Sequence, residues 1–507
     1  MAGRLTSAGT LVCRLVRQFV DNHEQHGICF APRTTADDLV IGCSPAHLPG
    51  CPADSCLMYA YLLYPLRLRW LTLFMACCPP TRGQPPTQPP TPTQVAIQWA
   101  NLSLAVIQNT PNNSPTYSSR ELAYLGIAMY ESVVHSNPRY RSLAGQLNGL
   151  AQLPRPDTAQ RYNWGLVLNT AQGFMLYKLY PHASRHTALR IDSLQRAITT
   201  ALVVTERTDV AERSIIYAWS LAGALFEWSK TDGGHEGYRR NFDPTYALPT
   251  GNGYWVPPTK GQSATRMALH PTWGLNRPFV PANGRLPIPA ELAYSSDSSS
   301  AYYREHQAVY RKNASLTQPE KEIAIWWADD PSQTAAPPGH SYNLATLTIQ
   351  AAPADVVKVT QTYAAVGMAV ADAFINCWKC KYKYHRERPS TFITSVIDPA
   401  WQPFWPEPPF PAYSSGHATQ AAAAATVLTA LYGEPFALTD VTHSGRLPEP
   451  LTGLPYTARQ FGSFWEMAEE CARSRLYGGI HTNVDNQTGL AQGREIGRQV
   501  NALQWHW

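Results

Sequence analysis

The sequence predicts an all-α fold, a large helical bundle interrupted by long irregular loops. Three observations support this prediction. Apolar residues recur at about 3.6-residue intervals along most of the chain after residue 94, strand-like alternation is scarce, and capping patterns precede several periodic stretches. At 507 residues the chain exceeds the usual size of one domain, so we expect a large core or two packed halves.

The helical periodicity can be followed element by element. Helices are predicted over 118–134, 163–181, 187–230, 302–312, 316–330, 343–378, 418–432, 463–476 and 485–503. Ser118 with Glu121, and Thr317 with Glu320, have the spacing of a capping box. Between residues 235 and 290 the chain is rich in Gly, Pro, Asn and Tyr, which predicts a long loop that is functional or packed over a site.

Composition narrows the class of protein. Charged residues make up 15% of the chain, below the roughly 25% of an average soluble protein, while 15 Trp and 26 Tyr are abundant, which favours a secreted or cell-envelope enzyme. The formal charge of +5 is spread without Lys/Arg runs, so we expect no nucleic-acid partner. The body has no long uncharged apolar stretch, so it is not expected to span a membrane.

The N-terminal region suggests export. Arg67 and Arg69 precede the apolar run at 70–76 and then Cys77, an order similar to a bacterial lipoprotein signal with a lipid anchor at Cys77. A buried hydrophobic helix and a plain secretion signal are the alternatives. The expected location is therefore the cell envelope or periplasm of a bacterium.

Five segments follow from these patterns. They are residues 1–57, an unstructured or mis-annotated extension; 58–78, the candidate export or lipoprotein signal; 79–93, a Pro-rich linker; 94–320, an N-terminal helical half; and 321–507, a C-terminal helical half with the functional site.

The first of three short C-terminal motifs is KYKYHRERP, residues 381–389. Lys381 and Arg388 are seven residues apart, which predicts that both point to one side near a helix end closed by Pro389. Alternatively, they only complement the dipole of that helix.

The second motif is PAYSSGHA, residues 411–418, directly before an Ala-rich helix. Ser415 and Gly416 would stand where free N–H groups and the positive end of the helix dipole attract an anion. Alternatively, Ser415 is a plain N-cap, Gly416 supplies turn freedom and His417 is a surface histidine.

The third motif is SRLYGGIH, residues 474–481, with Asp485 four residues further on. Arg475 would end a helix and two glycines would permit a tight bend before His481. A carboxylate that holds one imidazole nitrogen leaves the other free as a ligand or nucleophile. A Gly-broken helix junction with a surface histidine is the alternative.

Together the motifs supply one Lys, two Arg, a Ser-Gly pair and two His, groups suited to bind a tetrahedral oxyanion such as phosphate or vanadate. The order of these residues resembles the vanadium-dependent haloperoxidases and the related type 2 phosphatidic-acid phosphatases. In that family Lys and Arg-Pro are followed by Ser-Gly-His and then by Ser-Arg and His. Ser414 stands where Pro often precedes Ser-Gly-His. IWWADDP with PPGH (325–340), CWKCKY (377–382) and PPFPAY (408–413) are similar to the haloperoxidase branch.

The resemblance implies a role for each matched residue. Lys381, Arg388 and Arg475 would neutralise vanadate oxygens, Ser415 and the Gly416 amide would donate hydrogen bonds, His481 would ligate vanadium and His417 would transfer protons. Trp378 and Phe410 would line the halide side, or else pack as aromatic core. Asp330 and Asp485 would orient an Arg and the ligand His.

The function implied is a vanadium-dependent haloperoxidase of the helical haloperoxidase fold type. It would use vanadate as cofactor, with phosphate as an alternative occupant, and would oxidise halide with hydrogen peroxide for a small organic acceptor. The alternatives are an acid phosphatase that forms a phosphohistidine at His481, and a non-catalytic oxyanion-binding envelope protein. The long helical body, Trp378 and Phe410 favour the peroxidase, and the presence of both histidines argues against a pure binder.

Overall fold

The structure is a computed structural model, and it describes residues 88–258 and 261–507. The segments predicted at 1–57 and 58–78, with Cys77, lie outside the described residues, as does most of the linker 79–93, and export and lipidation stay predictions. The described part forms a compact unit over Pro90–Trp507.

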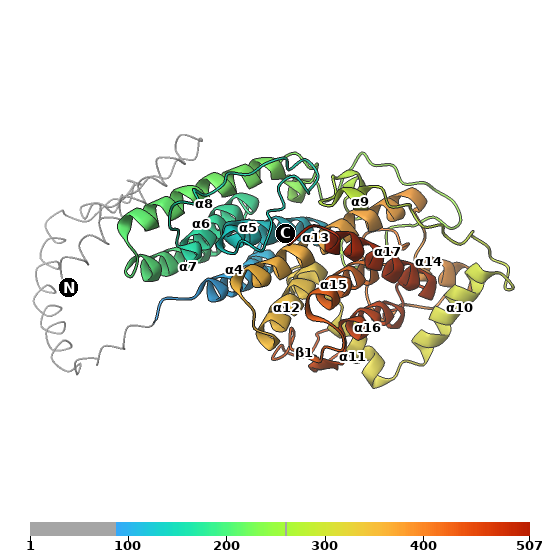
Figure 1. Cartoon of the computed structure of the whole chain (residues 1–507). Coiled ribbons are helices and arrows are strands. Elements are labelled where there is room, and N and C mark those ends of the chain that lie inside the picture. Colours follow the sequence, from blue (N-terminus) through green and yellow to red (C-terminus); the bar gives the residue numbers. More distant parts are fainter. Residues whose placement is uncertain (1–87, 259–260) are drawn as a thin grey trace, which may run out of the picture. The chain divides into compact units, whose positions relative to one another are not determined.

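The all-α prediction is confirmed, because helices dominate the unit (Figure 1). The α-helices are α4 (Pro92–Asn109), α5 (Pro115–Val133), α6 (Trp164–Leu179), α7 (Arg185–Val203), α8 (Thr208–Ser229), α9 (Pro281–Gly284), α10 (Ala301–Ala314), α11 (Gln318–Trp326), α12 (Ala336–Ala351), α13 (Val356–Tyr384), α14 (Pro389–Phe392), α15 (Gly416–Tyr432), α16 (Phe464–Tyr477) and α17 (Asn483–Asn501). Shorter elements are η1 (Val134–Ser136), η2 (Gly237–Arg239), η3 (Trp273–Leu275), η4 (Ile393–Ile397) and the antiparallel strands β1 (Leu438–Asp440) and β2 (Arg459–Phe461).

The predicted capping boxes had different outcomes. Thr317 and Glu320 cap α11 as predicted, with a Pro in the first turn. The box predicted from Ser118 and Glu121 is wrong, because α5 begins earlier, with Ser114 as its N-cap followed directly by a proline. Ser118 is inside the helix and its hydroxyl donates to the Ser114 carbonyl at 2.8 Å. A proline favours the first helical position, so it fixes the start of the helix one turn before the predicted box.

Two stretches predicted as continuous each form two helices. The stretch 187–230 divides into α7 and α8, and 343–378 divides into α12 and α13. In the second case Pro353 follows the end of α12, and the Asp355 side chain accepts from the first amides of α13. Periodicity alone does not reveal such short breaks, because apolar residues recur at the helical interval on both sides of them.

Helix α13 lies at the centre of the unit and packs against α5 on one side and α15 on the other. Helix α5 is buried along nearly its whole length. Figure 1 shows α6, α7 and α8 gathered beyond α5, while α14, α16 and α17 lie toward the opposite end. The C-terminal motifs therefore lie where α13, α15, α16 and α17 pack against one another.

Small residues let α15 and α17 pack backbone to backbone. Helix α15 is Ala-rich, and α17 presents Gly489, Gly493 and Gly497 to it at four-residue spacing. A Cβ at Gly489 would lie 2.7 Å from the Ser415 carbonyl oxygen, and one at Gly493 would meet the Thr419 carbonyl oxygen. This contact fixes the N-terminus of α15, where the second motif lies, against the helix that follows the third motif.

The predicted irregular region between residues 235 and 290 is confirmed as a long loop with only short helical turns. It lies along the segment before the second motif. The Leu269 amide donates to the Pro409 carbonyl at 2.8 Å, and the Gln262 amide donates to the Glu407 carbonyl at 2.9 Å. The loop therefore supports the chain that leads into the Ser-Gly-His sequence.

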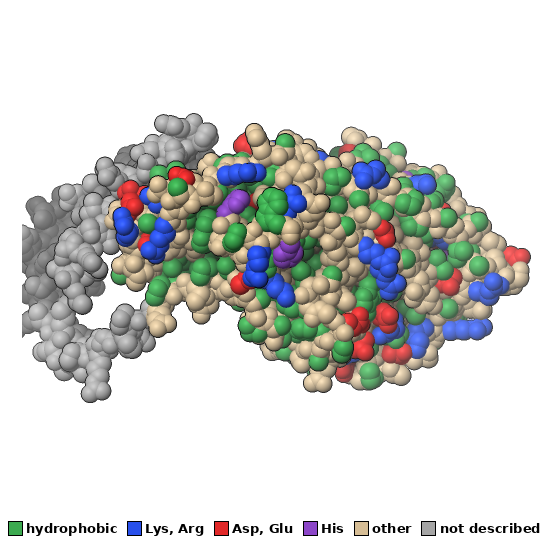
Figure 2. All heavy atoms as spheres, viewed as in Figure 1, with side chains coloured by type: hydrophobic (Ala, Val, Ile, Leu, Met, Phe, Trp, Pro, Cys, Tyr) green, Lys and Arg blue, Asp and Glu red, His purple; other side chains and the backbone are tan. Residues whose placement is uncertain are grey.

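No helix of the described residues is long and apolar enough to cross a membrane. On the face drawn in Figure 2, Lys and Arg side chains are scattered among other residues and form no continuous basic patch.

Replacing Gly493 with Ala tests the close helix contact. Overpacking of this kind costs about 1–3 kcal/mol, so Gly493→Ala should lower the free energy of unfolding by that amount in chemical denaturation. Gly223→Ala in α8 is the matched control, because a Cβ there meets no atom within 4 Å, and Ala should be neutral or stabilising by about 0.5–1 kcal/mol. Equal effects of the two changes would contradict the packing argument.

Candidate oxyanion site

The three C-terminal motifs converge on one buried site. Arg388 Nη1 lies 3.1 Å from His481 Nε2, and Arg475 Nη1 lies 3.2 Å from His417 Nε2. We call the converging set the cationic cage; it consists of Lys381, Arg388, Ser415, Gly416, His417, Arg475 and His481. Residues separated by up to a hundred positions in the sequence thus belong to one buried cluster.

The first motif reaches the site by a chain reversal and not along one helix. Helix α13 ends at Tyr384, and His385 has a left-handed backbone with φ of 50°. Arg388 therefore precedes α14, with Pro389 as the first residue of that helix. The prediction that Pro389 closes the helix that carries both residues is wrong, although the side chains of Lys381 and Arg388 are directed to the same site.

The geometry of His481 determines its tautomer. Its Nδ1 lies 3.0 Å from Asp485 Oδ2, so Nδ1 carries the hydrogen and donates to the carboxylate. Its Nε2 faces Arg388, which can only donate, and so Nε2 holds a lone pair. The carboxylate predicted to hold the imidazole is in place, and Nε2 is available as a ligand or nucleophile.

His417 has a similar arrangement with weaker support. Its Nε2 accepts from Arg475 Nη1, and its other nitrogen bonds to the backbone of Ala328. Unlike the buried His481, His417 is partly exposed, as are Gly416 and Phe410. These residues mark the side from which solvent and small solutes reach the cage.

Ser415 and Gly416 begin α15. Ser415 is the N-cap and Gly416 is the first helical residue. Gly416 has no positive φ, and a Cβ there would meet Trp378 and Cys377 only at 3.8 and 3.9 Å. Turn freedom therefore does not explain this glycine, whereas room in front of the helix N-terminus does.

Three cations are buried at this site, because Lys381, Arg388 and Arg475 are each 0% exposed. The Lys381 ammonium donates to the carbonyls of Pro411, Ala412 and Ser414 at 2.8, 2.8 and 2.7 Å. Arg388 donates to the carbonyls of Phe410 and Ile480. Arg475 Nε and Nη2 are buried and have no hydrogen-bond partner, so they are the donors left for an anion.

The pKa values reflect this crowding of charge. Burial and the charge of Arg388 lower the pKa of His481 to about 3, and burial lowers the pKa of Arg388 to about 10. Burial, together with Arg388, also lowers the pKa of Lys381 to about 8. Burial and the charge of Arg475 hold the pKa of His417 well below its usual value. Without an anion both imidazoles are therefore neutral at pH 7.

Trp378 and Phe410 lie beside Lys381. Their ring centroids are 4.9 Å apart, and the Lys381 Nζ lies 5.0 Å from the Phe410 ring centroid and 5.7 Å from that of Trp378. Trp378 is buried and donates to the Leu269 carbonyl, whereas Phe410 is partly exposed. Trp378 therefore supports the site from behind, and Phe410 lines its open side.

The two predicted carboxylates are placed differently. Asp485 contacts His481, but among the ion pairs of the described residues none joins Asp330 to Arg475. Asp330 instead accepts from Gln262 Nε2 at 2.7 Å, and burial raises its pKa to about 6 although the charge of Arg475 opposes the rise. The sequence patterns did not point to Glu407, a buried carboxylate whose charge acts on Arg388. It stands among aromatic and proline residues and belongs to none of the three motifs.

A second cluster of polar residues was also missed. Asp329, His340, His443 and Asp440 are buried together behind the cage. Asp329 and His340 belong to the ADD and PPGH sequences that were noted only for their resemblance. Asp440 is the last residue of β1, a short strand that the sequence pattern did not predict, and His443 follows that strand.

A buried cationic cage between helices has the donors expected of an oxyanion site, and comparisons with known proteins show the family to which the chain belongs. A family profile described as the VCPO second helical-bundle domain matches residues 361–506. A bacterial vanadium-dependent iodoperoxidase structure is 31% identical, with a TM-score of 0.69, covering 81% of this chain and 97% of that one. No curated protein matched the sequence.

Two structures of a bacterial vanadium-dependent chloroperoxidase share the fold. The holo form is 17% identical with a TM-score of 0.58, covering 82% of this chain and 93% of that one. The apo form is 16% identical with a TM-score of 0.58, covering 83% and 95%. The identity and coverage of the iodoperoxidase show that this chain belongs to the vanadium-dependent haloperoxidase family.

The residues present fit the vanadate that this family implies. Arg475 has buried donors without partners, Gly416 leaves room at a helix N-terminus, and His481 offers a lone pair on Nε2. An anion with several oxygens and one open coordination position matches this set of donors.

The lowered pKa of Lys381 predicts how oxyanion affinity depends on pH. Below about pH 8 the Lys381 ammonium is already charged, so oxyanion affinity should not change with pH. Above about pH 8 the Lys381 amine must take up a proton when the anion binds, so affinity should fall by up to about tenfold per pH unit. Tungstate is the probe, because its own protonation does not change in this range, and calorimetry measures its affinity.

Lys381→Met provides the comparison for that titration. It should bind tungstate more weakly throughout and lose the decline that begins near pH 8. Unchanged affinity of the unmodified chain from about pH 7 to about pH 9 would contradict the assignment to Lys381.

Proposed function

We propose that this protein is a vanadium-dependent haloperoxidase that oxidises halide with hydrogen peroxide at vanadate held by His481. The observation that carries the proposal is the orientation of His481. Asp485 holds its Nδ1 at 3.0 Å, and its Nε2 lone pair faces the buried cations. Membership of the family supports the same assignment.

The cage residues would hold the cofactor by charge and hydrogen bonds. Arg475 would donate from Nε and Nη2, and Ser415 and the Gly416 amide would donate from the start of α15. Vanadate, when bound, supplies a pentavalent Lewis acid that activates hydrogen peroxide without changing its own oxidation state. Lys381 would contribute its positive charge but no hydrogen bond, because all three of its N–H donors already bind backbone carbonyls.

His417 is suited to proton transfer. The overall reaction takes halide, hydrogen peroxide and one proton to hypohalous acid and water, so a group must move protons to and from the peroxide oxygens. His417 is neutral, partly exposed and held on one side by Ala328. Its Nε2 accepts from Arg475 Nη1 in this structure, and with that guanidinium turned to the bound anion it would take a proton from incoming peroxide and return it to the oxygen that leaves as water.

Halide would approach from the side of Phe410. That ring is partly exposed beside Lys381 Nζ, whose charge attracts an anion to an otherwise apolar surface. Iodide is the first halide to test, because the relative with 31% identity is described as an iodoperoxidase. The oxidised halide would then react with a small organic acceptor.

The deciding experiment uses the purified full chain with hydrogen peroxide and iodide, bromide or chloride, with and without vanadate. Halide oxidation that requires vanadate is expected. Hydrolysis of p-nitrophenyl phosphate that vanadate only inhibits would instead indicate a phosphatase in which His481 attacks phosphorus. Inactivity in both assays, with oxyanion still bound, would indicate a binding protein.

Replacing His481 with Ala should remove the vanadate ligand. We expect vanadate to be lost on gel filtration and halide oxidation to fall to background, because the remaining cage offers only charges and hydrogen bonds. His186→Ala, on the exposed surface of α7, is the control and should retain both. A fully active His481→Ala variant would show that the ligand has been assigned wrongly.

Replacing His417 with Ala should separate binding from turnover. Vanadate should still be retained, because His417 is not the ligand, while turnover should fall by about 10²–10⁴-fold with loss of its proton-transfer group. The measurement is the rate at saturating peroxide as a function of pH. An unchanged rate and pH profile would exclude His417 from proton transfer.

A further inference from the structure

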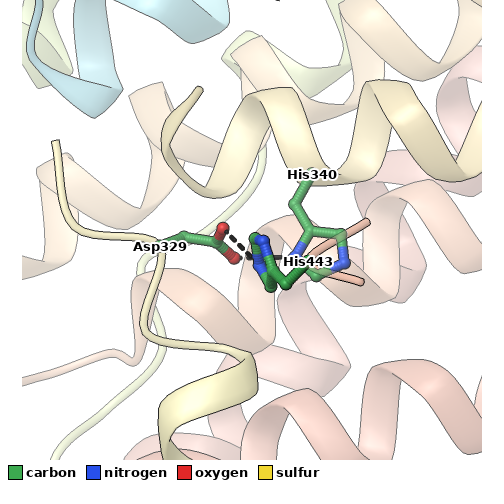
Figure 3. Close-up of side chains that lie close together, drawn as sticks. All are labelled: Asp329, His340 and His443. Carbon is green, nitrogen blue, oxygen red and sulfur yellow. Dashed lines mark hydrogen bonds and ion pairs between the residues drawn. The ribbon is translucent and has the colours of Figure 1, made fainter. Parts of the chain in front are cut away.

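A second buried cluster, distinct from the cage, has the composition of a metal site. It contains Asp329 from the loop after α11, His340 from the first turns of α12 and His443 from the loop after β1. Figure 3 shows the Asp329 carboxylate pointing toward the two imidazole rings. The three residues are 3%, 3% and 2% exposed, and their ligand atoms lie within 4.8 Å of one another.

His340 lies between two carboxylates. Its Nε2 is 2.8 Å from Asp440 Oδ2 and its Nδ1 is 2.7 Å from Asp329 Oδ2. Asp440 is fixed in turn by the Trp326 indole N–H and by the backbone and hydroxyl of Thr442. A rigid carboxylate that accepts from Nε2–H leaves Nδ1 directed at Asp329, which is the carboxylate–histidine arrangement found behind metal-ligating imidazoles.

Two further atoms of the cluster have no hydrogen bond. Asp329 Oδ1 and His443 Nε2 lie 3.1 Å apart, yet neither makes a hydrogen bond of acceptable geometry. Both belong to residues more than nine-tenths buried. A buried oxygen and a buried ring nitrogen that make no hydrogen bond are costly unless something bridges them.

We propose that Asp329, His340 and His443 bind a divalent transition-metal ion of the zinc class. Two imidazole nitrogens and one carboxylate oxygen are a donor set typical of zinc, which takes four ligands. A cavity of about 370 Å³ includes these three residues in its lining, and water from it would supply the fourth ligand. The proposal does not depend on the chemistry of the cage.

A divalent ion is compatible with the charge of the cluster. Asp329 and Asp440 bring two negative charges into the protein interior, and a divalent ion bound by neutral imidazoles would balance both. Buried charges are tolerated where they are paired or coordinate metals.

The metal would fix the segment that links this cluster to the cage. Trp327 stacks on His340 with ring centroids 4.6 Å apart, and its carbonyl accepts from Arg475 at 3.2 Å. The next residue, Ala328, bonds to His417 through its backbone. We therefore assign the ion a structural role, because it would hold Asp329 and with it the contacts of two cage residues.

The test is metal content and metal spectroscopy of the purified full chain, with no halide or vanadate assay. Chain freed of metal by a chelator should bind zinc with one ion per chain and a Kd below about 1 μM by calorimetry. Cobalt(II) added to the same material should give the intense visible absorption of a four-coordinate ion with nitrogen ligands.

Variants locate the ion. His443→Asn should weaken zinc binding by at least about 100-fold and abolish the cobalt spectrum. His306→Asn removes another buried histidine, whose Nδ1 bonds only to a backbone carbonyl, and should keep both. Circular dichroism checks that each variant is folded.

Two results would overturn the proposal. One is an unmodified chain that binds neither zinc nor cobalt(II) more tightly than folded His443→Asn. If His443→Asn does not fold, the other is a cobalt(II) spectrum of the unmodified chain typical of six-coordinate surface binding. Either result would leave a proton, shared by His340 with its two carboxylates, as the bridging group. Since metal content is measured without peroxide or vanadate, this outcome is independent of the proposed peroxidase activity.

Discussion

The site depends on the burial of three positive charges that make no ion pair within the described residues. Lys381, Arg388 and Arg475 are fully buried, and the nearby carboxylates Asp485, Glu407 and Asp330 act on them only from a distance. Burial of unpaired charge is costly, and the protein offsets part of the cost with backbone carbonyls. The lowered pKa values of these three groups reflect the part of this cost that the carbonyls do not offset. An oxyanion would remove this cost when it binds, so the fold itself supplies part of the affinity.

Close packing of small residues holds this arrangement in place. The Ala-rich α15 and the glycines of α17 bring the two backbones together, so Ser415 at the start of α15 lies against the helix that carries Asp485. The Ser415 amide donates to the Asp485 carbonyl at 3.1 Å, which joins the two motifs directly. A cage built on such contacts cannot relax by moving one motif away from another. The cations therefore stay together even though they repel.

Much of this could be predicted from the sequence, since helical periodicity and the motif residues are local signals. The helix boundaries were less predictable. Ser118 has the spacing of a cap but is displaced by the proline that begins α5, and Arg388 continues the spacing of α13 although His385 reverses the chain. The cluster around Asp329 could not be predicted because His443 lies about a hundred residues after Asp329 and His340, and none of the three stands in a metal-binding motif. The spacing of residues along the sequence cannot show that these side chains meet. They meet only when the segments that follow α11 and β1 lie beside α12.

The segment from Trp327 to Asp330 explains why the two buried sites are not separate features. Consecutive residues alternate between them: the Trp327 carbonyl and the Ala328 backbone contact Arg475 and His417, while the Trp327 ring and the Asp329 carboxylate contact His340. Asp329 also has a left-handed backbone, with φ of 49°, a conformation that a side chain rarely adopts unless its contacts hold it there. Any group that holds the Asp329 carboxylate therefore also sets the position of two backbone carbonyls. Those carbonyls orient the guanidinium and the imidazole on the open side of the cage, where a proton must be transferred.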